Sequence, residues 1–342
     1  KPAAVEVMET PAASVWTAEK ANDWYARQAW IAGANFIPST AINQLEMWQA
    51  ESFDMATISR ELQWAQQIGF NTMRVYLHHK AWEIDSTGFL NRLDQYLGIA
   101  GSKGIKTILV FFDDVWNKDS KTGVQPAPKP GTHNSGWLQD PGDPYSKDST
   151  IFPQLEKYVK SVLGHLKNDS RVLLWDLYNE PGNSGKGETS LPLLASVFGW
   201  ARQVDPSQPV SAGLWNPEQT AYNRFLLDHS DVITYHNYDS TDKHRATIDS
   251  LKKFGRPLIC SEYMARTRGS KFSNIMPMLK ENKVGAINWG LVAGKTNTIY
   301  AWDTPMPDGK EPPVWFHDIF RSKDGSPFDP KEIALIKSLT GK

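Results

Sequence analysis

Cysteine is almost absent from this chain, which has 342 residues and a single cysteine, Cys260. No disulfide can therefore form within it, and the cysteine count does not indicate a redox compartment. A chain of this length can bury a sizeable core without disulfides or a structural metal. We expect Cys260 to be a small buried hydrophobic residue rather than a nucleophile.

Strong charge of one sign and long apolar runs are lacking as well. The formal net charge is −1, with neither a basic stripe nor an acidic tail, which argues against nucleic acid and strongly charged partners. No apolar run approaches the roughly 18 residues that a membrane-spanning helix needs. We expect a monomer that does not bind nucleic acid and has no membrane span.

The first residues, Lys1-Pro2-Ala3-Ala4, include no initiator methionine and no apolar core of a signal peptide. We expect a mature secreted or periplasmic protein from which a signal peptide has been removed. This expectation is an interpretation of the first residues, because the sequence contains no signal peptide that could be read directly.

Tryptophan, by contrast, is abundant: the chain has 14, together with 11 tyrosines and 14 phenylalanines. The flat apolar face of an indole ring stacks well on the C–H face of a pyranose ring. We expect most tryptophans, including Trp64, Trp175 and Trp200, to pack in the core. The count alone is therefore only a weak indication of carbohydrate binding.

Apolar segments alternate with amphipathic segments along the chain. The apolar segments predict buried strands at Trp30–Phe36, Asn71–Leu77, Ile105–Phe112, Val172–Tyr178, Val210–Leu214, Val232–Tyr235, Leu258–Ser261 and Ala286–Trp289. The amphipathic segments predict helices at Asp54–Gln67, Leu90–Lys103, Phe152–Lys167, Leu191–Gln203, Thr220–Leu227, Thr241–Phe254, Ser273–Asn282 and Lys331–Ser338. Continuous apolarity is typical of parallel strands covered by helices. We predict an α/β fold, a single (β/α)8 TIM barrel over residues 30–342 preceded by an N-terminal extension over residues 1–29.

The N-terminal extension and two long connections complete the predicted fold. A helix at Ala18–Arg27 should close the bottom of the barrel or pack on its side. The connections at about 113–150 and 291–316 follow the third and eighth strands, at the end of a barrel where active sites lie. Tryptophans in these connections argue against disorder; they are Trp116, Trp137, Trp302 and Trp315. A doubly wound sheet is disfavoured because no G-x-G-x-x-G motif follows the first strand.

Two glutamates directly follow buried strands. The fourth predicted strand leads into Asn179-Glu180-Pro181, and the seventh leads into Glu262. Ionisable groups beside buried apolar strands are costly unless they are paired or catalytic. Because parallel strands end at one rim of a barrel, Glu180 and Glu262 can flank a single substrate bond, as glycoside hydrolysis by two carboxylates requires.

These motifs resemble those of clan A glycoside hydrolases, most of all family 5, the cellulase and mannanase family. Asn179-Glu180-Pro181 is similar to the acid/base motif of the family, and Glu262 matches its nucleophile. Arg74, on the second strand, matches the arginine that orients the nucleophile. The other matching positions are His236 and Tyr238 after the sixth strand and Trp289, expected under the bound sugar, on the eighth. The resemblance covers about residues 30–290.

The resemblance implies a retaining β-glycoside hydrolase that acts on a plant-type glucan, mannan or xylan, with no cofactor and no metal. Glu262 would act as the nucleophile, kept ionised by Arg74 and Tyr238. Glu180 would first donate a proton and later accept one from water. Asn179 would contact the 2-hydroxyl group of the sugar.

The third strand departs from the family pattern, which usually places a histidine at its end. Asp113 and Asp114 stand near that position and are candidates either to bind substrate hydroxyls or to anchor the following loop. Trp116 and Trp137, within this loop, could line sugar subsites or hold the loop in place. The contact to the sugar at the point of cleavage, and with it the substrate, stays open.

Histidines supply further candidates. His78 and His79 sit at the end of the second predicted strand. Adjacent residues on a strand point to opposite faces, so a shared metal ion is disfavoured. His79 is instead a candidate for hydrogen bonding to substrate. His236 would orient Glu180 or a substrate hydroxyl.

Each candidate also has a structural alternative. Glu180 could cap a helix, Glu262 could be an ion-paired rim residue, and Arg74 could serve a structural ion pair. The remaining matching side chains could pack in the top of the barrel or in its core. Two other functions are alternatives: a barrel that binds glycans without cleaving them, and a metal-dependent barrel hydrolase. Because both long loops rise from the catalytic face, we expect a restricted pocket rather than an open cleft.

Overall fold

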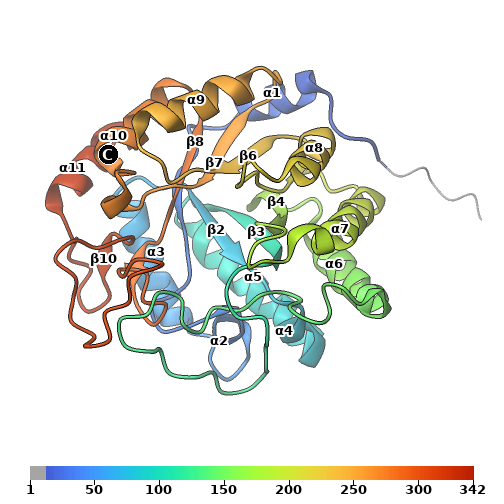
Figure 1. Ribbon diagram of the computed structural model, residues 1–342, viewed down its shortest axis with the longest axis horizontal. Coiled ribbons are helices and arrows are strands. Elements are labelled where there is room, and N and C mark those ends of the chain that lie inside the picture. Colours follow the sequence, from blue (N-terminus) through green and yellow to red (C-terminus); the bar gives the residue numbers. More distant parts are fainter. Residues whose placement is uncertain (1–12) are drawn as a thin grey trace, which may run out of the picture.

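The computed structural model describes residues 13–342, and parallel strands form its centre (Figure 1). The strands are β1 (Ala32–Asn35), β2 (Thr72–Tyr76), β3 (Lys106–Asp113), β4 (Val172–Asn179), β5 (Val210–Ser211), β6 (Ile233–His236), β7 (Leu258–Glu262) and β8 (Gly285–Trp289). Hydrogen bonds join them in the order β5-β4-β3-β2-β1-β8-β7-β6. An isolated β-bridge between Leu214 and Tyr235 joins the segment after β5 to β6, the two strands at the ends of this order. The sheet is a nearly closed (β/α)8 TIM barrel, which confirms the predicted fold class.

Helices surround the barrel (Figure 1). They are α1 (Ala18–Ala26), α2 (Gln44–Trp48), α3 (Met55–Gln67), α4 (His79–Ile84), α5 (Ser86–Ser102), α6 (Phe152–Leu166), α7 (Leu191–Val204), α8 (Thr220–His229), α9 (Thr241–Lys252), α10 (Phe272–Glu281) and α11 (Pro330–Thr340). Aspartate caps fix two of the starts: Asp54 accepts the backbone N–H of Thr57, and Asp329 accepts that of Lys331. Helices α2 and α4 were not predicted, because segments this short carry little helical periodicity.

Helix α1 and the residues beside it cover the amino-terminal ends of the strands. Trp16 and Trp24 are buried in one apolar cluster with side chains from the barrel. Those side chains are Ile31, Ile108, Leu173, Leu174, Val232, Ile259 and Ile287. The Tyr25 hydroxyl donates to the carbonyl of Lys283, just before β8. The first part of the predicted N-terminal extension, residues 1–12, lies outside the described residues.

The core contains most of the side chains that the sequence assigned to it. Trp175 and Cys260 are fully buried, and Trp200 is nearly so. Trp64 is partly buried and packs against the same core. No helix among residues 13–342 has both the length and the apolarity that crossing a bilayer requires.

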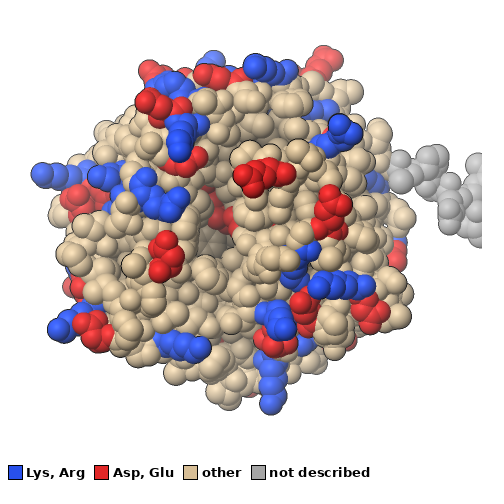
Figure 2. Space-filling view, in the orientation of Figure 1, with Lys and Arg blue, Asp and Glu red and all other residues tan. Residues whose placement is uncertain are grey.

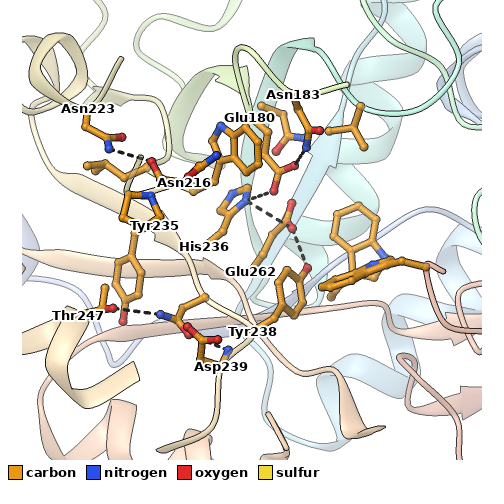
Figure 3. Close-up of a pocket in the computed structure, with 18 of the residues that line it drawn as sticks. Glu180, Asn183, Asn216, Asn223, Tyr235, His236, Tyr238, Asp239, Thr247 and Glu262 are labelled. Atoms are coloured by element: carbon orange, nitrogen blue, oxygen red, sulfur yellow. Dashed lines mark hydrogen bonds and ion pairs between the residues drawn. The ribbon is translucent and has the colours of Figure 1, made fainter. Parts of the chain in front are cut away.

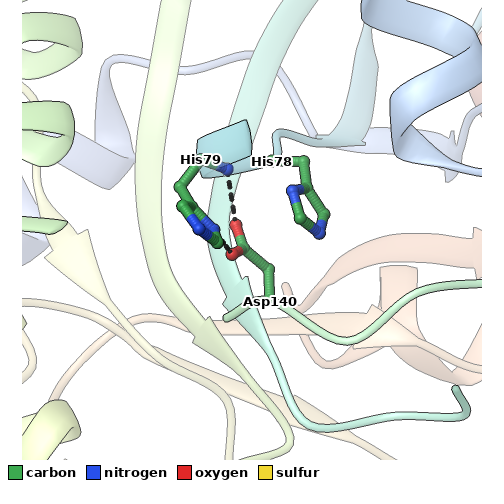
Figure 4. A group of neighbouring side chains, drawn as sticks. All are labelled: His78, His79 and Asp140. Carbon is green, nitrogen blue, oxygen red and sulfur yellow. Dashed lines mark hydrogen bonds and ion pairs between the residues drawn. The ribbon is translucent and has the colours of Figure 1, made fainter. Parts of the chain in front are cut away.

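The histidine pair after β2 lies differently from the prediction. His78 caps α4 and His79 begins it, so both residues have left the strand, and their rings stack with centroids 5.2 Å apart. The expectation that the two rings point to opposite faces is therefore wrong. Asp140 accepts the backbone N–H of His79 and contacts its ring Nδ1 (Figure 4). Backbone hydrogen bonds join Asp140 to Asp113, so this buried group anchors the loop that follows β3.

A second buried ionisable group, Glu61 on α3, supports the loop that follows β1. Its carboxyl oxygens accept the backbone N–H of Ser39 at 2.6 and 3.3 Å. Burial raises the pKa of Glu61 to about 7, and the hydrogen bond from Ser39 offsets part of that rise. Above the unfolded pKa of 4.5, the folded protein therefore keeps a proton that the unfolded chain has released.

We predict that the contribution of Glu61 to the free energy of unfolding falls as the pH rises from 4.5 to about 7. The contribution of Glu61 is at most about 1.4 kcal/mol per pH unit. Glu61→Gln removes this contribution, so the free energy of unfolding in urea, taken as variant minus wild type, should increase as the pH rises across this range. Glu156→Gln, at a partly exposed glutamate of α6, is the matched control. Parallel profiles for wild type and Glu61→Gln would contradict the prediction.

Candidate active site

The carboxyl ends of the strands surround a pocket of about 940 Å³. Figure 2 shows a hollow near the centre of this face, with acidic atoms inside it. The predicted site residues that line the pocket are Trp116, Trp137, Asn179, Glu180, His236, Tyr238, Glu262 and Trp289. The predicted site residues that lie buried behind its wall are Arg74, His79, Asp113 and Asp114.

Glu180 follows the last residue of β4 and takes a left-handed backbone conformation, with a φ of 46°. This conformation turns the chain out of the strand, and the side chain projects into the pocket (Figure 3). Its Oε2 accepts Nδ2 of Asn183 at 2.6 Å, and its Oε1 lies 2.8 Å from Nδ1 of His236. The carboxyl group is thus held by two partners while one edge faces the pocket.

Glu262 ends β7, and its carboxylate is buried among hydrogen-bond donors. One oxygen accepts Nη1 of Arg74 at 2.9 Å and the Tyr76 hydroxyl at 3.0 Å. The other oxygen accepts the Tyr238 hydroxyl at 2.7 Å (Figure 3). Burial alone would raise the pKa of Glu262. The charges of His236 and Arg74 and the hydrogen bonds from the two tyrosines outweigh burial and hold this pKa below its ordinary value. Glu262 is therefore ionised at neutral pH.

Arg74 supplies the fixed positive charge behind Glu262. It occupies the middle of β2 and is completely buried. Its Nε and Nη2 lie 2.9 and 2.8 Å from the Asp176 carboxylate. Nη1 also donates to Asn35, and Nη2 donates to Asn179, each at 2.8 Å. These acceptors belong to β1 and β4, so the strand register of the barrel fixes the guanidinium group.

Tyr76 is a site residue that the sequence analysis missed. Its hydroxyl accepts from Arg74 at 2.6 Å and lies 3.0 Å from the Glu262 carboxylate. Tyr76 stands two residues after Arg74 on the same strand, and this spacing places both side chains on the same face. The position of Tyr76 two residues after the predicted arginine was the feature of the sequence that could have identified it as a site residue.

The aspartates at the end of β3 support the site without facing the pocket. Asp113 accepts Nδ2 of Asn179 at 3.0 Å and Nε1 of Trp137 at 2.8 Å. Burial raises the pKa of Asp113, and these two hydrogen bonds work against that rise. Asp114 accepts the Tyr178 hydroxyl at 2.7 Å. Of the two roles expected for these aspartates, the structure favours holding neighbouring groups over contact with substrate, and His79 is likewise part of a loop anchor.

His236 lies between the two carboxylates. Its Nδ1 is 2.8 Å from Oε1 of Glu180 and 3.4 Å from Oε2 of Glu262. One polar atom from each of these three residues lies within 4.8 Å of the other two. The same spacing could present ligands to a metal ion, but the Glu262 carboxylate already accepts three hydrogen bonds, which leaves it little capacity for one. The group of His78, His79 and Asp140 has similar spacing and serves as the loop anchor described above.

Aromatic rings form the walls of the pocket. Trp289, at the end of β8, makes edge contacts with Trp137 and Tyr76, with ring centroids 5.8 and 5.9 Å apart. Such indole rings offer apolar faces for stacking on sugars. The sequence analysis also missed Trp215, His133 and His317, which line the pocket from loops. Loops have no hydrophobic periodicity, so nothing in the sequence marked these residues.

Comparison with known proteins points to the same kind of site. Residues 32–294 match the family described as Cellulase (glycosyl hydrolase family 5). No curated protein sequence matches the chain significantly.

Several solved structures share the fold at low sequence identity. An endo-β-1,4-mannanase from Thermotoga petrophila is 17% identical, with a TM-score of 0.59, over 93% of this chain and 77% of that one. A β-1,4-mannanase from the sea hare Aplysia kurodai is 16% identical, with a TM-score of 0.58, over 77% and 88%. An exo-β-1,4-mannosidase from Opitutaceae bacterium strain TAV5 is 17% identical, with a TM-score of 0.59, over 92% and 59%.

The family match extends over more than half of the chain and includes both glutamates of the pocket. At these low sequence identities, the similarity to the solved structures shows only a shared fold. The chain belongs to glycosyl hydrolase family 5 and is a glycoside hydrolase.

Proposed function

We propose that the protein is a retaining β-glycosidase that cleaves plant-type β-linked oligo- or polysaccharides by double displacement. The observation that carries the proposal is the pairing of Glu180 and Glu262, with oxygens within 4.8 Å of each other across the pocket. Retaining enzymes hold their two carboxyl groups about 5–5.5 Å apart, whereas inverting enzymes need about 6.5–9.5 Å to admit a water molecule. The observed spacing therefore supports the retaining mechanism.

In the first step, the Glu262 carboxylate attacks the anomeric carbon of the bound sugar. Glu180 donates its proton to the glycosidic oxygen, the bond from that oxygen to the anomeric carbon breaks, and the aglycone leaves as an alcohol. Arg74 and Tyr238 keep Glu262 anionic before the attack. His236 holds the Glu180 carboxyl group at the edge of the pocket.

In the second step, water releases the sugar from Glu262. Glu180, now deprotonated, removes a proton from a water molecule whose oxygen attacks the anomeric carbon. The ester bond to Glu262 breaks, and the product keeps its original β configuration. Asn179 lines the pocket beside both glutamates, and Asp113 and Arg74 fix its amide. It is suited to bind the 2-hydroxyl group of the sugar, where interactions strengthen in the transition state.

The substrate class extends over β-glucans, β-mannans and β-xylans, as family membership allows. The solved structures that share this fold include mannanases and an exo-mannosidase. We therefore propose β-mannosides as the first substrates to test, beside the corresponding glucosides and xylosides. A panel of aryl β-glycosides and plant polysaccharides separates these classes.

We predict that Glu262→Ala and Glu180→Ala each lower kcat on the best aryl glycoside by about 10²-fold or more. Azide should restore product formation in both variants, because a small anion can occupy the space of the missing carboxylate. Glu180→Ala should then yield the β-glycosyl azide, and Glu262→Ala the α-glycosyl azide. Wild-type turnover in both variants would overturn the assignment.

We predict that the sugar released in the first seconds of turnover is the β anomer. Two successive inversions at the anomeric carbon restore the starting configuration. Proton NMR of the fresh product, recorded before mutarotation, measures the outcome. Initial appearance of the α anomer would refute a retaining mechanism and leave the glycosidase assignment intact.

We predict that Tyr238→Phe moves the acidic limb of the kcat/KM profile to higher pH. The reaction needs ionised Glu262, and the Tyr238 hydroxyl helps to hold the pKa of Glu262 below its ordinary value. Activity is lost as the pH falls through that pKa, so removal of the donor should shift the loss upward. Tyr25→Phe, at the far end of the barrel, is the control. An acidic limb that stays in place or moves downward in Tyr238→Phe would contradict the prediction.

A further inference from the structure

The two long loops meet at one end of the pocket. The backbone N–H of Asn134 donates to Thr296 at 2.8 Å, and that of Met306 donates to Gly131 at 3.0 Å. Gly131 has a φ of 61°, and a Cβ atom there would lie 1.7 Å from the Met306 carbonyl oxygen. This close approach requires glycine. The loop after β3 and the loop after β8 are thus joined into one wall.

This wall stands on the nucleophile side of the pocket. Tyr238 binds Glu262, and its ring contacts Trp302 and His317 with centroids 4.9 and 5.6 Å away. In Figure 3, Tyr238 lies on one side of Glu262, and Glu180 lies on the other. Since the nucleophile attacks the sugar that it will carry, this side receives the glycone.

The acid side of the pocket is built from different residues. Asn183 donates to Glu180, and Trp215 donates to the carbonyl of Pro181 at 3.2 Å. The proton donor serves the leaving group, so these residues lie where the aglycone departs. The pocket therefore has two chemically distinct ends, and the joined loops stand at the glycone end.

The glycone end contains buried hydrogen-bond acceptors without partners. His317 is fully buried, and its Nδ1–H donates to the carbonyl of Met264 at 2.6 Å, so Nε2 is an acceptor. Neither this Nε2 nor Oδ1 of Asn134 has a hydrogen-bond partner among residues 13–342. Burial and the nearby charge of Arg266 hold the pKa of His317 well below its usual range, so its ring is neutral at neutral pH.

His133, from the loop after β3, lies beside this group, and its Nε2 accepts Nδ2 of Asn134 at 3.4 Å, which leaves Oδ1 of Asn134 without a partner. Its Nδ1–H donates to the carbonyl of Tyr300 at 2.8 Å, and its ring lies 5.5 Å from that of His317. Burial lowers the pKa of His133 to about 4, despite the hydrogen bond to Tyr300. His133, Asn134 and His317 all line the pocket, and each is at least nine-tenths buried.

A buried acceptor without a donor carries a free-energy cost, because it has lost its hydrogen bonds to water. Such a cost is removed when a ligand brings hydroxyl donors, and sugars carry hydroxyls beside C–H faces that stack on aromatic rings. Trp116 and Trp302 line the same end of the pocket and offer such rings. The ligand that this group of side chains recognises is therefore a neutral sugar residue that donates hydrogen bonds.

We propose that His317, His133 and Asn134 form a hydroxyl-binding subsite for the terminal glycone residue, and that the joined loops make the enzyme cleave from the non-reducing chain end. The proposal rests on the proposed glycosidase function and adds the part of the substrate that is recognised. The histidines are specificity residues, since the chemical steps do not need them.

The first experiment follows the products of chain cleavage. The probe is a β-1,4-linked hexasaccharide of the preferred sugar with an isotope label at its reducing end, analysed by mass spectrometry over time. The expected result is a series of labelled products that shorten from the unlabelled end. Early labelled fragments of all lengths, produced by internal cuts, would overturn the proposal. This outcome is distinct from failure of the proposed function, in which no β-glycoside is cleaved.

The second experiment isolates His317. His317→Phe should lower kcat/KM on the preferred 4-nitrophenyl β-glycoside by about 10-fold or more, whereas His317→Asn, which keeps an acceptor, should lose less. His165→Phe on α6, partly exposed and away from the pocket, is the control. Both His317 variants are first compared with wild type by thermal unfolding. If the phenylalanine variant does not fold, His317→Leu, which also lacks an acceptor, takes its place in this and the following experiment.

Monodeoxy substrates distinguish recognition from a structural role. In wild type, removal of the hydroxyl that His317 binds should lower kcat/KM about 10-fold. The same removal should change kcat/KM little in His317→Phe, because the lost hydrogen bond is already absent. Equal losses in wild type and variant at every hydroxyl position would overturn the assignment of His317.

Discussion

The ion pair between Arg74 and Glu262 is the interaction on which the rest of the site depends. A buried carboxylate is costly, and burial by itself would raise the pKa of Glu262 and favour the protonated form, which is a poor nucleophile. A guanidinium group held by Asp176, Asn35 and Asn179 offsets that cost. Because these partners stand on strands β1 and β4 of the barrel, the guanidinium group cannot move away when substrate enters. The barrel scaffold thus keeps the Glu262 carboxylate ionised although it is buried away from water.

Around this pair the site divides into layers. The strands hold the groups that set charge, and the two tyrosines Tyr76 and Tyr238 complete the donor set around Glu262. Asp113 lies farther out and holds Asn179 and Trp137 in place. The loops after β3 and β8 contribute the walls, including His133 and His317. The groups around Glu262 thus stand on or directly after the rigid strands, whereas much of the pocket wall comes from loops, which vary more readily.

Periodicity and position on a strand were the features that the sequence made predictable. Glu180 and Glu262 were recognisable because a charged residue after a buried apolar run needs an explanation. Tyr76 was recoverable in principle, because it shares a strand face with Arg74. His79 was misjudged, because the strand ends one residue earlier than expected and a short helix begins. His133 and His317 could not be predicted, since they are far apart in sequence and meet only through hydrogen bonds between two loops.

The proposed mechanism requires Glu262 to be the anionic group that bonds to the sugar. An activated 2-deoxy-2-fluoro β-glycoside of the preferred sugar slows the second step more than the first, so the glycosyl-enzyme should accumulate. Proteolysis and mass spectrometry of the inactivated protein then locate the attached sugar. The mechanism predicts one equivalent of sugar, bound to the peptide that contains Glu262 and absent in Glu262→Ala. Attachment of the sugar to Glu180, or to any peptide without Glu262, would contradict it.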